Sequence, residues 1–268
     1  MERKISPFSK LFLAVIFFVL YAPIFFLVFY SFNSGETMYN FEGVTLDWYR
    51  ELFGDTRLLI IVLNTVVVAL LSALFSTIIG IIGALAIYIA KRKQTKNTLL
   101  AMNNVLIVSP DVIIGASFLI LFTTAGIKLG FYSVLLSHIA FCIPIVVLMV
   151  LPKLMEMSPS LIDAARDLGA NHWDVMTKVI IPYISPGILA GFFMVLTYSF
   201  DDFAVTFFVT GNGFSTLSVE IYSLARRGIS LSINALSALL FLFTMILVVI
   251  YYFIVQNNKV NGAGVRKR

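Results

Sequence analysis

Residues 158–182 read SPSLIDAARDLGANHWDVMTKVIIP, a polar segment that lies between two hydrophobic stretches. Ser158 is suited to cap a first helix. Gly169 fits the turn that ends it. Asn171 is suited to cap a second helix, with Asp174 placed three residues further on as in a capping box. The segment therefore predicts two short helices joined at a glycine, at the edge of a hydrophobic region.

One face of the first predicted helix is apolar. At helical spacing it carries Leu161, Ala164, Ala165 and Leu168. The second helix contributes two large side chains of the kind that interfaces favour, Trp173 and Met176. We therefore expect the pair to dock into another protein.

This helix pair has two other interpretations. A glycine turn between two helices also describes a DNA-binding helix-turn-helix. The hydrophobic stretches on both sides and a net charge near zero argue against it. A helix pair lying flat on lipid would carry more basic residues than this one does.

The composition is that of a membrane protein. Of 268 residues, 60% are hydrophobic and 12% charged, with a mean hydropathy of +0.97, whereas soluble domains are roughly half apolar. About 20 apolar residues are needed to span a bilayer as a helix. Six stretches qualify, at residues 11–32, 60–90, 99–125, 133–152, 183–209 and 233–256. We predict an all-α polytopic protein with six transmembrane helices, forming one membrane domain over residues 1–268 with a polar loop at 153–182.

Basic residues indicate the orientation. Fourteen of the 19 Lys and Arg residues fall on one predicted side of the membrane, which is expected to be cytoplasmic. They lie at the N-terminus, after the second stretch, in the polar loop and in the C-terminal tail. Both termini and the 158–182 segment are therefore predicted to be cytoplasmic. The net charge of +5 follows from this asymmetry and does not indicate a nucleic-acid partner.

A sequence signature runs through the polar segment. It consists of Asp163-Ala164-Ala165, then Gly169 four residues on, then Val179-Ile180-Ile181-Pro182. This resembles the EAA signature of type I, binding-protein-dependent ABC importer permeases, with Asp for Glu, Val for Ile and Ile for Leu. The resemblance implies that the loop couples the membrane helices to an ATP-hydrolysing subunit. The residues expected to take part are Asp163, Ala164, Ala165, Gly169, Trp173 and Pro182.

Three acidic residues lie inside predicted membrane stretches, namely Asp111, Asp201 and Asp202. Burying a charge in lipid is expensive, so such residues are functional candidates. No Lys or Arg lies deep in any stretch, so we expect these acids to have no partner within the chain, and to be protonated or to await a cation. Two alternatives stay open. Asp111 follows Ser109-Pro110 and is suited to cap a restarting helix, and one of the adjacent pair is suited to a structural role.

Other polar and aromatic residues are weaker candidates. Trp48 lies in an acidic loop predicted to be external, where it anchors at the membrane surface or contacts the solute. Tyr198 offers a ring for cation–π contact. His138 is expected to be a contact between helices rather than a ligand. Cys142 is the only cysteine, so the chain has no internal disulfide and no cysteine-based metal site.

A second resemblance narrows the solute. Three segments are similar to the spermidine/putrescine branch of these permeases, of the PotC type: Ser199-Phe200-Asp201-Asp202-Phe203, Phe208-Val209-Thr210-Gly211 and Ile221-Tyr222-Ser223. This implies that Asp111, Asp201, Asp202 and Trp48 line a route for polyamines, and we add the neighbouring Tyr198 and Ser199. An importer of another solute (a metal ion, an opine or another amine) and a non-transporting membrane subunit are the alternatives.

The resemblance also implies partners in a bacterial inner membrane. These are a second similar permease, two copies of an ATP-binding subunit, an external polyamine-binding protein and membrane lipid. The chain has no Walker-type glycine loop. We therefore expect no enzymatic activity, no cofactor and no metal in this chain, with ATP and Mg held by the partner ATPase.

Overall fold

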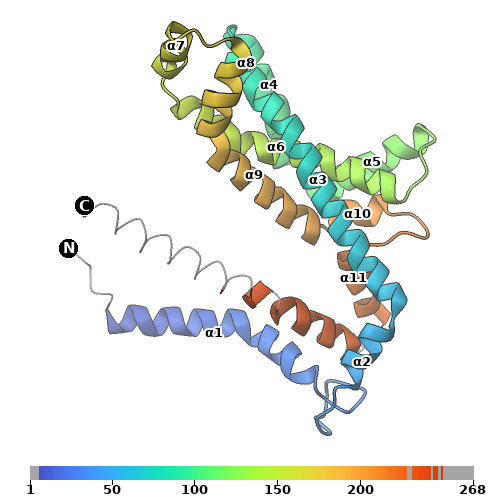
Figure 1. Cartoon of the computed structure of the whole chain (residues 1–268). Helices are drawn as coiled ribbons and strands as arrows, with labels where there is room; N and C mark the ends of the chain where they lie inside the picture. Colours follow the sequence, from blue (N-terminus) through green and yellow to red (C-terminus); the bar gives the residue numbers. More distant parts are fainter. Residues whose placement is uncertain (1–5, 228–230, 243, 247–248, 250–268) are drawn as a thin grey trace. The chain divides into compact units, whose positions relative to one another are not determined.

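The computed structural model describes residues 6–227, 231–242, 244–246 and 249. These residues are organised as two compact units (Figure 1). One unit comprises Met1–Leu59 with Ile221–Arg268, and the other comprises Ile60–Glu220. Within the described ranges the secondary structure is helical apart from one isolated β-bridge between Asn33 and Val44. The prediction of an all-α chain is confirmed.

The helices follow the hydrophobic stretches and the polar loop. Their bounds are α1 (Pro7–Tyr30), α2 (Asp47–Gly54), α3 (Thr56–Ile89), α4 (Lys93–Val108), α5 (Asp111–Thr124), α6 (Phe131–Glu156), α7 (Pro159–Asp167), α8 (His172–Val175), the π-helix η1 (Met176–Ile180), α9 (Ile181–Asp201), α10 (Ala204–Val209) and α11 (Leu217–Arg227). Residues 231–242 are also helical.

Among the residues that the structure describes, four helical segments are long and apolar enough to cross a membrane. They are Phe8–Tyr30, Thr56–Ile89, Phe131–Glu156 and His172–Asp201. The predicted span at 99–125 is instead two helices, α4 and α5, bent by 104°, because Pro110 donates no backbone N–H and interrupts the helix. The predicted span at 233–256 lies partly outside the described residues. Among those described, up to five spans are found, and the sixth stays a prediction.

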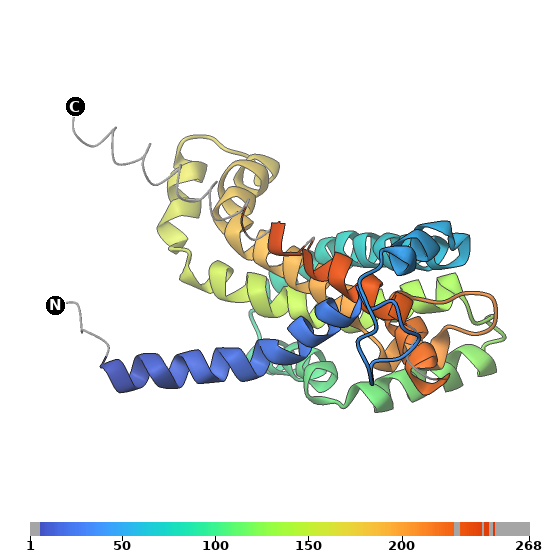
Figure 2. The same cartoon turned by 90° about the horizontal axis from the view of Figure 1, so that it is seen from below.

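Helix α6 is the centre of the second unit. Val134, Val146 and Leu154 on this helix are fully buried. Helix α9 runs alongside α6 (Figures 1 and 2). The two backbones come close at Gly187, where an added Cβ would lie 2.8 Å from the carbonyl oxygen of Met149. Small residues thus let the membrane helices pack backbone to backbone, as is common in lipid.

The glycine corner of the polar loop has the predicted form. Gly169 has a positive φ of 84°. Its N–H donates to the Arg166 carbonyl over 2.8 Å, and the Ala170 N–H donates to the Ala165 carbonyl over 3.0 Å. This pair of bonds is a Schellman motif, which satisfies the last carbonyls of α7. Ser158 occupies the N-cap position of α7, but its side chain makes no capping bond.

The second predicted helix of this loop is not a separate element. Asn171 caps it as expected, since its Oδ1 accepts from the Asp174 N–H over 2.9 Å. The carboxylate of Asp174 pairs with Lys178 over 2.6 Å instead of completing a capping box. The helix then continues through η1 into α9. The wider π turn lies directly before Pro182, where a regular turn would clash with the proline ring.

The first unit contains a tightly bonded loop between α1 and α2. Asn33 is fully buried there. Its amide nitrogen donates to the carbonyls of Thr37 (2.9 Å) and Asn40 (2.8 Å). Its Oδ1 accepts from the N–H of Glu42 (2.8 Å) and Gly35 (3.3 Å). One side chain thus fixes the path of the acidic loop.

Candidate functional site

The second unit has two helix breaks that meet in space. Helix α9 ends at Asp201 and α10 begins at Ala204, while α5 begins at Asp111 after the Ser109-Pro110 interruption. Helices α5 and α10 pack closely at Gly115, where an added Cβ would lie 2.7 Å from a ring atom of Phe208. This contact brings the start of α5 to the end of α9.

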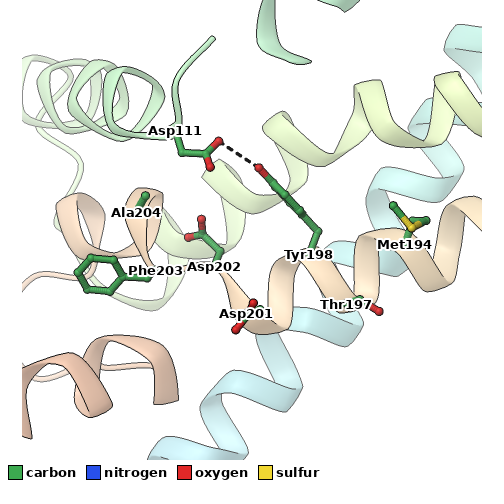
Figure 3. A pocket seen from close by; sticks show the side chains of 8 residues that line it. All are labelled: Asp111, Met194, Thr197, Tyr198, Asp201, Asp202, Phe203 and Ala204. Carbon is green, nitrogen blue, oxygen red and sulfur yellow. Dashed lines mark hydrogen bonds between the residues drawn. The ribbon is translucent and has the colours of Figure 1, made fainter. Parts of the chain in front are cut away.

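A hollow of about 400 Å³ lies at this junction. It is lined by Asp111, Met194, Thr197, Tyr198, Asp201, Asp202, Phe203 and Ala204 (Figure 3). The volume is in the range of small-molecule sites, roughly 300–1,000 Å³. Three of the eight lining residues are acidic and none is Lys or Arg. The three acidic residues identified as candidates in the sequence therefore lie around one hollow in the folded chain.

The side chains around the hollow fall into two groups. Those of Asp111, Tyr198 and Asp202 point toward one another, whereas Thr197 and Asp201 project from another side of α9 (Figure 3). Residues four apart on a helix share a face and adjacent residues do not. The adjacent aspartates are in different surroundings because α9 ends at Asp201 and the backbone of Asp202 is extended, with ψ at 121°.

Asp111 is exposed and is the first residue of α5. It makes no side-chain capping bond to that helix, whose N-cap position is taken by Pro110. Instead its Oδ1 accepts a hydrogen bond from the Tyr198 hydroxyl over 3.0 Å. Of the two interpretations left open by the sequence, the geometry favours a residue that faces the hollow over a helix cap.

Asp202 is buried and well bonded. Its Oδ2 accepts from the N–H (2.8 Å) and the hydroxyl (2.7 Å) of Thr206, and its Oδ1 accepts from the Val205 N–H (3.4 Å). His138 Nε2 lies 3.5 Å from the same Oδ2. The prediction that the intramembrane acids have no partner in the chain is therefore wrong for Asp202. The expectation of no partner rested on Lys and Arg alone, whereas the partner is His138, which was expected to be a contact between helices.

Asp201 differs from its neighbour in every respect. It is exposed, and within the described part of the chain it makes no hydrogen bond or ion pair. One carboxylate of the pair is therefore bonded within the fold, and the other is exposed at the hollow. This is the division of roles that the sequence left open.

Two predicted path residues lie elsewhere. Ser199 is buried and does not line the hollow, because its hydroxyl is hydrogen-bonded to His138 Nδ1 over 2.7 Å. Trp48 belongs to the first unit, where it is half-buried and its Nε1–H donates to the Asn33 carbonyl over 2.7 Å. A role for Trp48 on the solute route stays a prediction.

The structure also adds residues that the sequence analysis missed. Thr197 and Met194 line the hollow, and Thr206 holds Asp202. Their spacing was a usable signal, since Thr197 precedes Asp201 by four residues and Thr206 follows Asp202 by four. Within the described ranges, no group of three or more His, Cys, Asp or Glu residues is arranged to hold a metal ion.

The surface of the polar loop differs in part from the predicted apolar face. Leu161, Leu168 and Trp173 are exposed, Trp173 by 74%. Ala165 and Met176 pack instead against the core of their own unit. Ala165 turns inward because α7 packs through Ile162 and Ala165, which are three residues apart and share a helix face. Asp163, Ala164 and Pro182 are exposed.

Comparison with known proteins defines the class. A family model described as "binding-protein-dependent transport system inner membrane component" matches residues 76–259. The chain belongs to this family of multi-pass inner-membrane permeases. The resemblance that rests on the Asp163–Pro182 signature is thus confirmed.

Particular relatives have substantial identity over nearly their whole length. The spermidine/putrescine transport system permease protein PotC of Shigella flexneri is 37% identical, over 95% of this chain and 97% of the relative. PotC of Haemophilus influenzae is 33% identical, over 92% and 96%. The putrescine transport system permease protein PotI of Escherichia coli K12 is 33% identical, over 88% and 86%.

Solved structures share the fold. A chain of a bacterial ABC transporter that imports the acidic polysaccharide alginate aligns with a TM-score of 0.69 at 15% identity, over 95% of this chain and 99% of that chain. A chain of the MetNI methionine ABC transporter in an inward-facing conformation aligns with a TM-score of 0.58 at 20% identity, over 74% and 90%. At these identities the likeness concerns the fold alone.

Proposed function

We propose that this chain is a permease subunit of an ATP-driven importer of polyamines such as spermidine and putrescine. The observation that carries the proposal is the acidic hollow, which joins three carboxylates, a tyrosine and a phenylalanine without any Lys or Arg. Carboxylates and aromatic rings are the groups that bind alkyl ammonium ions. The names of the relatives support the same solute.

Within this hollow we assign the ammonium groups to Asp111 and Asp201, whose carboxylates are exposed. Met194 and Phe203 line the same hollow, and their apolar side chains suit the methylene segments of a polyamine. The polyamine must be bound weakly enough to be released. Exposed carboxylates in an open hollow meet this condition, because water competes with the ammonium groups for them.

The assembly is part of the proposal. The chain would form one membrane domain with six spans and cytoplasmic termini. It would pair with a second permease, and the solute would pass between the two. An external binding protein would deliver the solute. Two ATP-binding subunits would carry ATP and Mg, and the 158–182 loop would pass their closure to the membrane helices as a rigid-body motion.

Uptake of radiolabelled spermidine tests the proposal in cells that lack their own polyamine importers and carry the complete transporter. Asp201→Asn removes the charge with little change of shape, and we expect KM to rise at least about tenfold, or about 1.4 kcal/mol of binding. Asp201→Glu is the matched control, because it keeps the charge and should retain most of the affinity. The assignment would be refuted if these cells, carrying the unaltered transporter, took up no polyamine, or took up another solute with which spermidine does not compete.

A further inference from the structure

The buried network beside the hollow joins both sides of a helix break. His138 on α6 is fully buried. Its Nδ1 lies 2.7 Å from the hydroxyl of Ser199 on α9, and its Nε2 lies 2.8 Å from the hydroxyl of Thr206 on α10. One imidazole ring thus contacts the helix before the break and the helix after it. The partners are 61 and 68 residues away along the chain.

The hydrogen atoms in this network can be assigned. The Thr206 hydroxyl has one hydrogen, which it donates to Asp202 Oδ2 over 2.7 Å. Toward His138 the same oxygen can only accept, so Nε2 must carry a hydrogen and donate it. In a neutral ring Nδ1 then accepts, and the Ser199 hydroxyl donates to it. The proton order is therefore Ser199 to His138 to Thr206 to Asp202.

This order leaves Asp202 few free lone pairs. Its carboxylate already accepts from Val205, from the two donors of Thr206, and faces His138 Nε2 at 3.5 Å. The main-chain carbonyl of Asp202 is bonded as well, since it accepts from the Ser218 hydroxyl over 2.6 Å. An ammonium ion would have to displace these donors to bind Asp202, whereas Asp201 offers an unbonded carboxylate.

We propose that His138 is a positioning residue of the transporter, which acts through Thr206 and Asp202. It fixes the turn between α9 and α10, so that Asp202 stays in the fold while Asp201 and Tyr198 are presented to the solute. This inference rests on the proposed function for its transport readout. The ring also packs against Phe141, at 5.0 Å between ring centroids, and Phe141 in turn contacts Tyr198.

A matched pair of substitutions tests whether the contact between Nε2 and Thr206 is required. His138→Gln places an amide N–H near the position of Nε2 and keeps the donor to Thr206. His138→Asn carries the same amide but reaches only the position of Nδ1. We expect His138→Gln to keep KM near the wild-type value. His138→Asn should raise KM by about three- to tenfold, as for a lost neutral hydrogen bond. Equal KM values for the two variants would show that the contact with Thr206 is not required and would overturn the positioning role of His138.

A double-mutant cycle tests whether His138 acts through Asp202. His138→Phe, Asp202→Asn and the double variant are compared for KM of uptake and for melting temperature in detergent. We expect strong non-additivity, with the double variant no worse than the poorer single one, since both changes break one network. Additive changes in KM and melting temperature would show that His138 serves only in packing. A lower Vmax caused by low abundance, with KM unchanged, would show the same.

The melting temperatures keep the two proposals separable. His138→Phe leaves the Asp202 charge buried with one polar neighbour fewer, so adding Asp202→Asn should restore part of the lost stability. This comparison needs no solute. If the unaltered transporter imports no polyamine but the melting temperatures are non-additive, the proposed function is wrong and the coupling of His138 to Asp202 is confirmed. If polyamine uptake is normal but both KM and melting temperature change additively, the proposed function stands and the positioning role of His138 is wrong.

Discussion

The hydroxyl of Tyr198 donates a hydrogen bond to Oδ1 of Asp111 over 3.0 Å and so ties the end of α9 to the first residue of α5. The two residues are 87 positions apart in the sequence. Both side chains are exposed and line the hollow. The bond orients a carboxylate that would otherwise rotate freely at a helix start.

Tyr198→Phe should therefore weaken solute binding without abolishing it. It removes one hydrogen bond, worth about 0.5–1.5 kcal/mol, and we expect KM for spermidine to rise about two- to tenfold. Asp111→Asn removes the charge and should have a larger effect. Tyr183→Phe is the matched control, because its hydroxyl also makes one bond, to the Glu156 carbonyl over 3.2 Å, away from the hollow. An equal change in KM for Tyr183→Phe would show a general loss of stability instead.

The polar loop shows which features sequence alone could predict. Its glycine corner, its Asn171 cap and its exposed Trp173 depend on residues within a few positions of one another. The continuous passage through η1 into α9 was missed, because a proline normally marks a helix start and a π turn leaves no clear residue pattern. At Ser109-Pro110 the sequence predicted that a helix restarts. It could not predict the 104° bend between α4 and α5, because that angle depends on packing.

The acidic site was predictable to a similar extent. Three acids in apolar stretches indicate a functional site wherever the helices lie, because lipid makes an idle charge costly. The roles of the three acids depend on contacts between distant segments. His138 meets Ser199 and Thr206 only in the folded unit, so the sequence showed that one aspartate was suited to a structural role but not which one.

Trp173 should contribute to contact with the ATP-binding subunit. It is 74% exposed on the polar loop, and truncation of a central interface tryptophan typically costs about 2 kcal/mol or more. We expect Trp173→Ala to reduce co-purification of that subunit and solute-stimulated ATPase activity. Tyr39→Ala is the control, since Tyr39 is 91% exposed in the loop predicted to be external. Undiminished co-purification and ATPase activity in Trp173→Ala would remove this residue from the interface.

Gly169 should tolerate asparagine better than valine. Its φ of 84° lies in the left-handed region, which asparagine adopts readily and β-branched residues avoid. An added Cβ would meet no atom within 4 Å, so backbone conformation alone decides the outcome. We expect Gly169→Val to uncouple ATP hydrolysis from uptake, whereas Gly169→Asn keeps both. The two rates are measured on the same reconstituted complex, and equal coupling in both variants would contradict a role for this turn.

Gly80 and Gly83 on α3 offer a matched test of helix packing. A Cβ added at Gly80 would lie 2.5 Å from Val146 Cβ on α6, whereas one at Gly83 would lie 3.4 Å from a Val147 methyl group. Gly80→Ala forces the two helices apart, and overpacking of this kind costs about 1–3 kcal/mol. Gly83→Ala makes an ordinary contact and gains helix propensity. We expect a lower melting temperature in detergent for Gly80→Ala and an unchanged or higher one for Gly83→Ala. The reverse order would mean that α3 and α6 do not pack through Gly80.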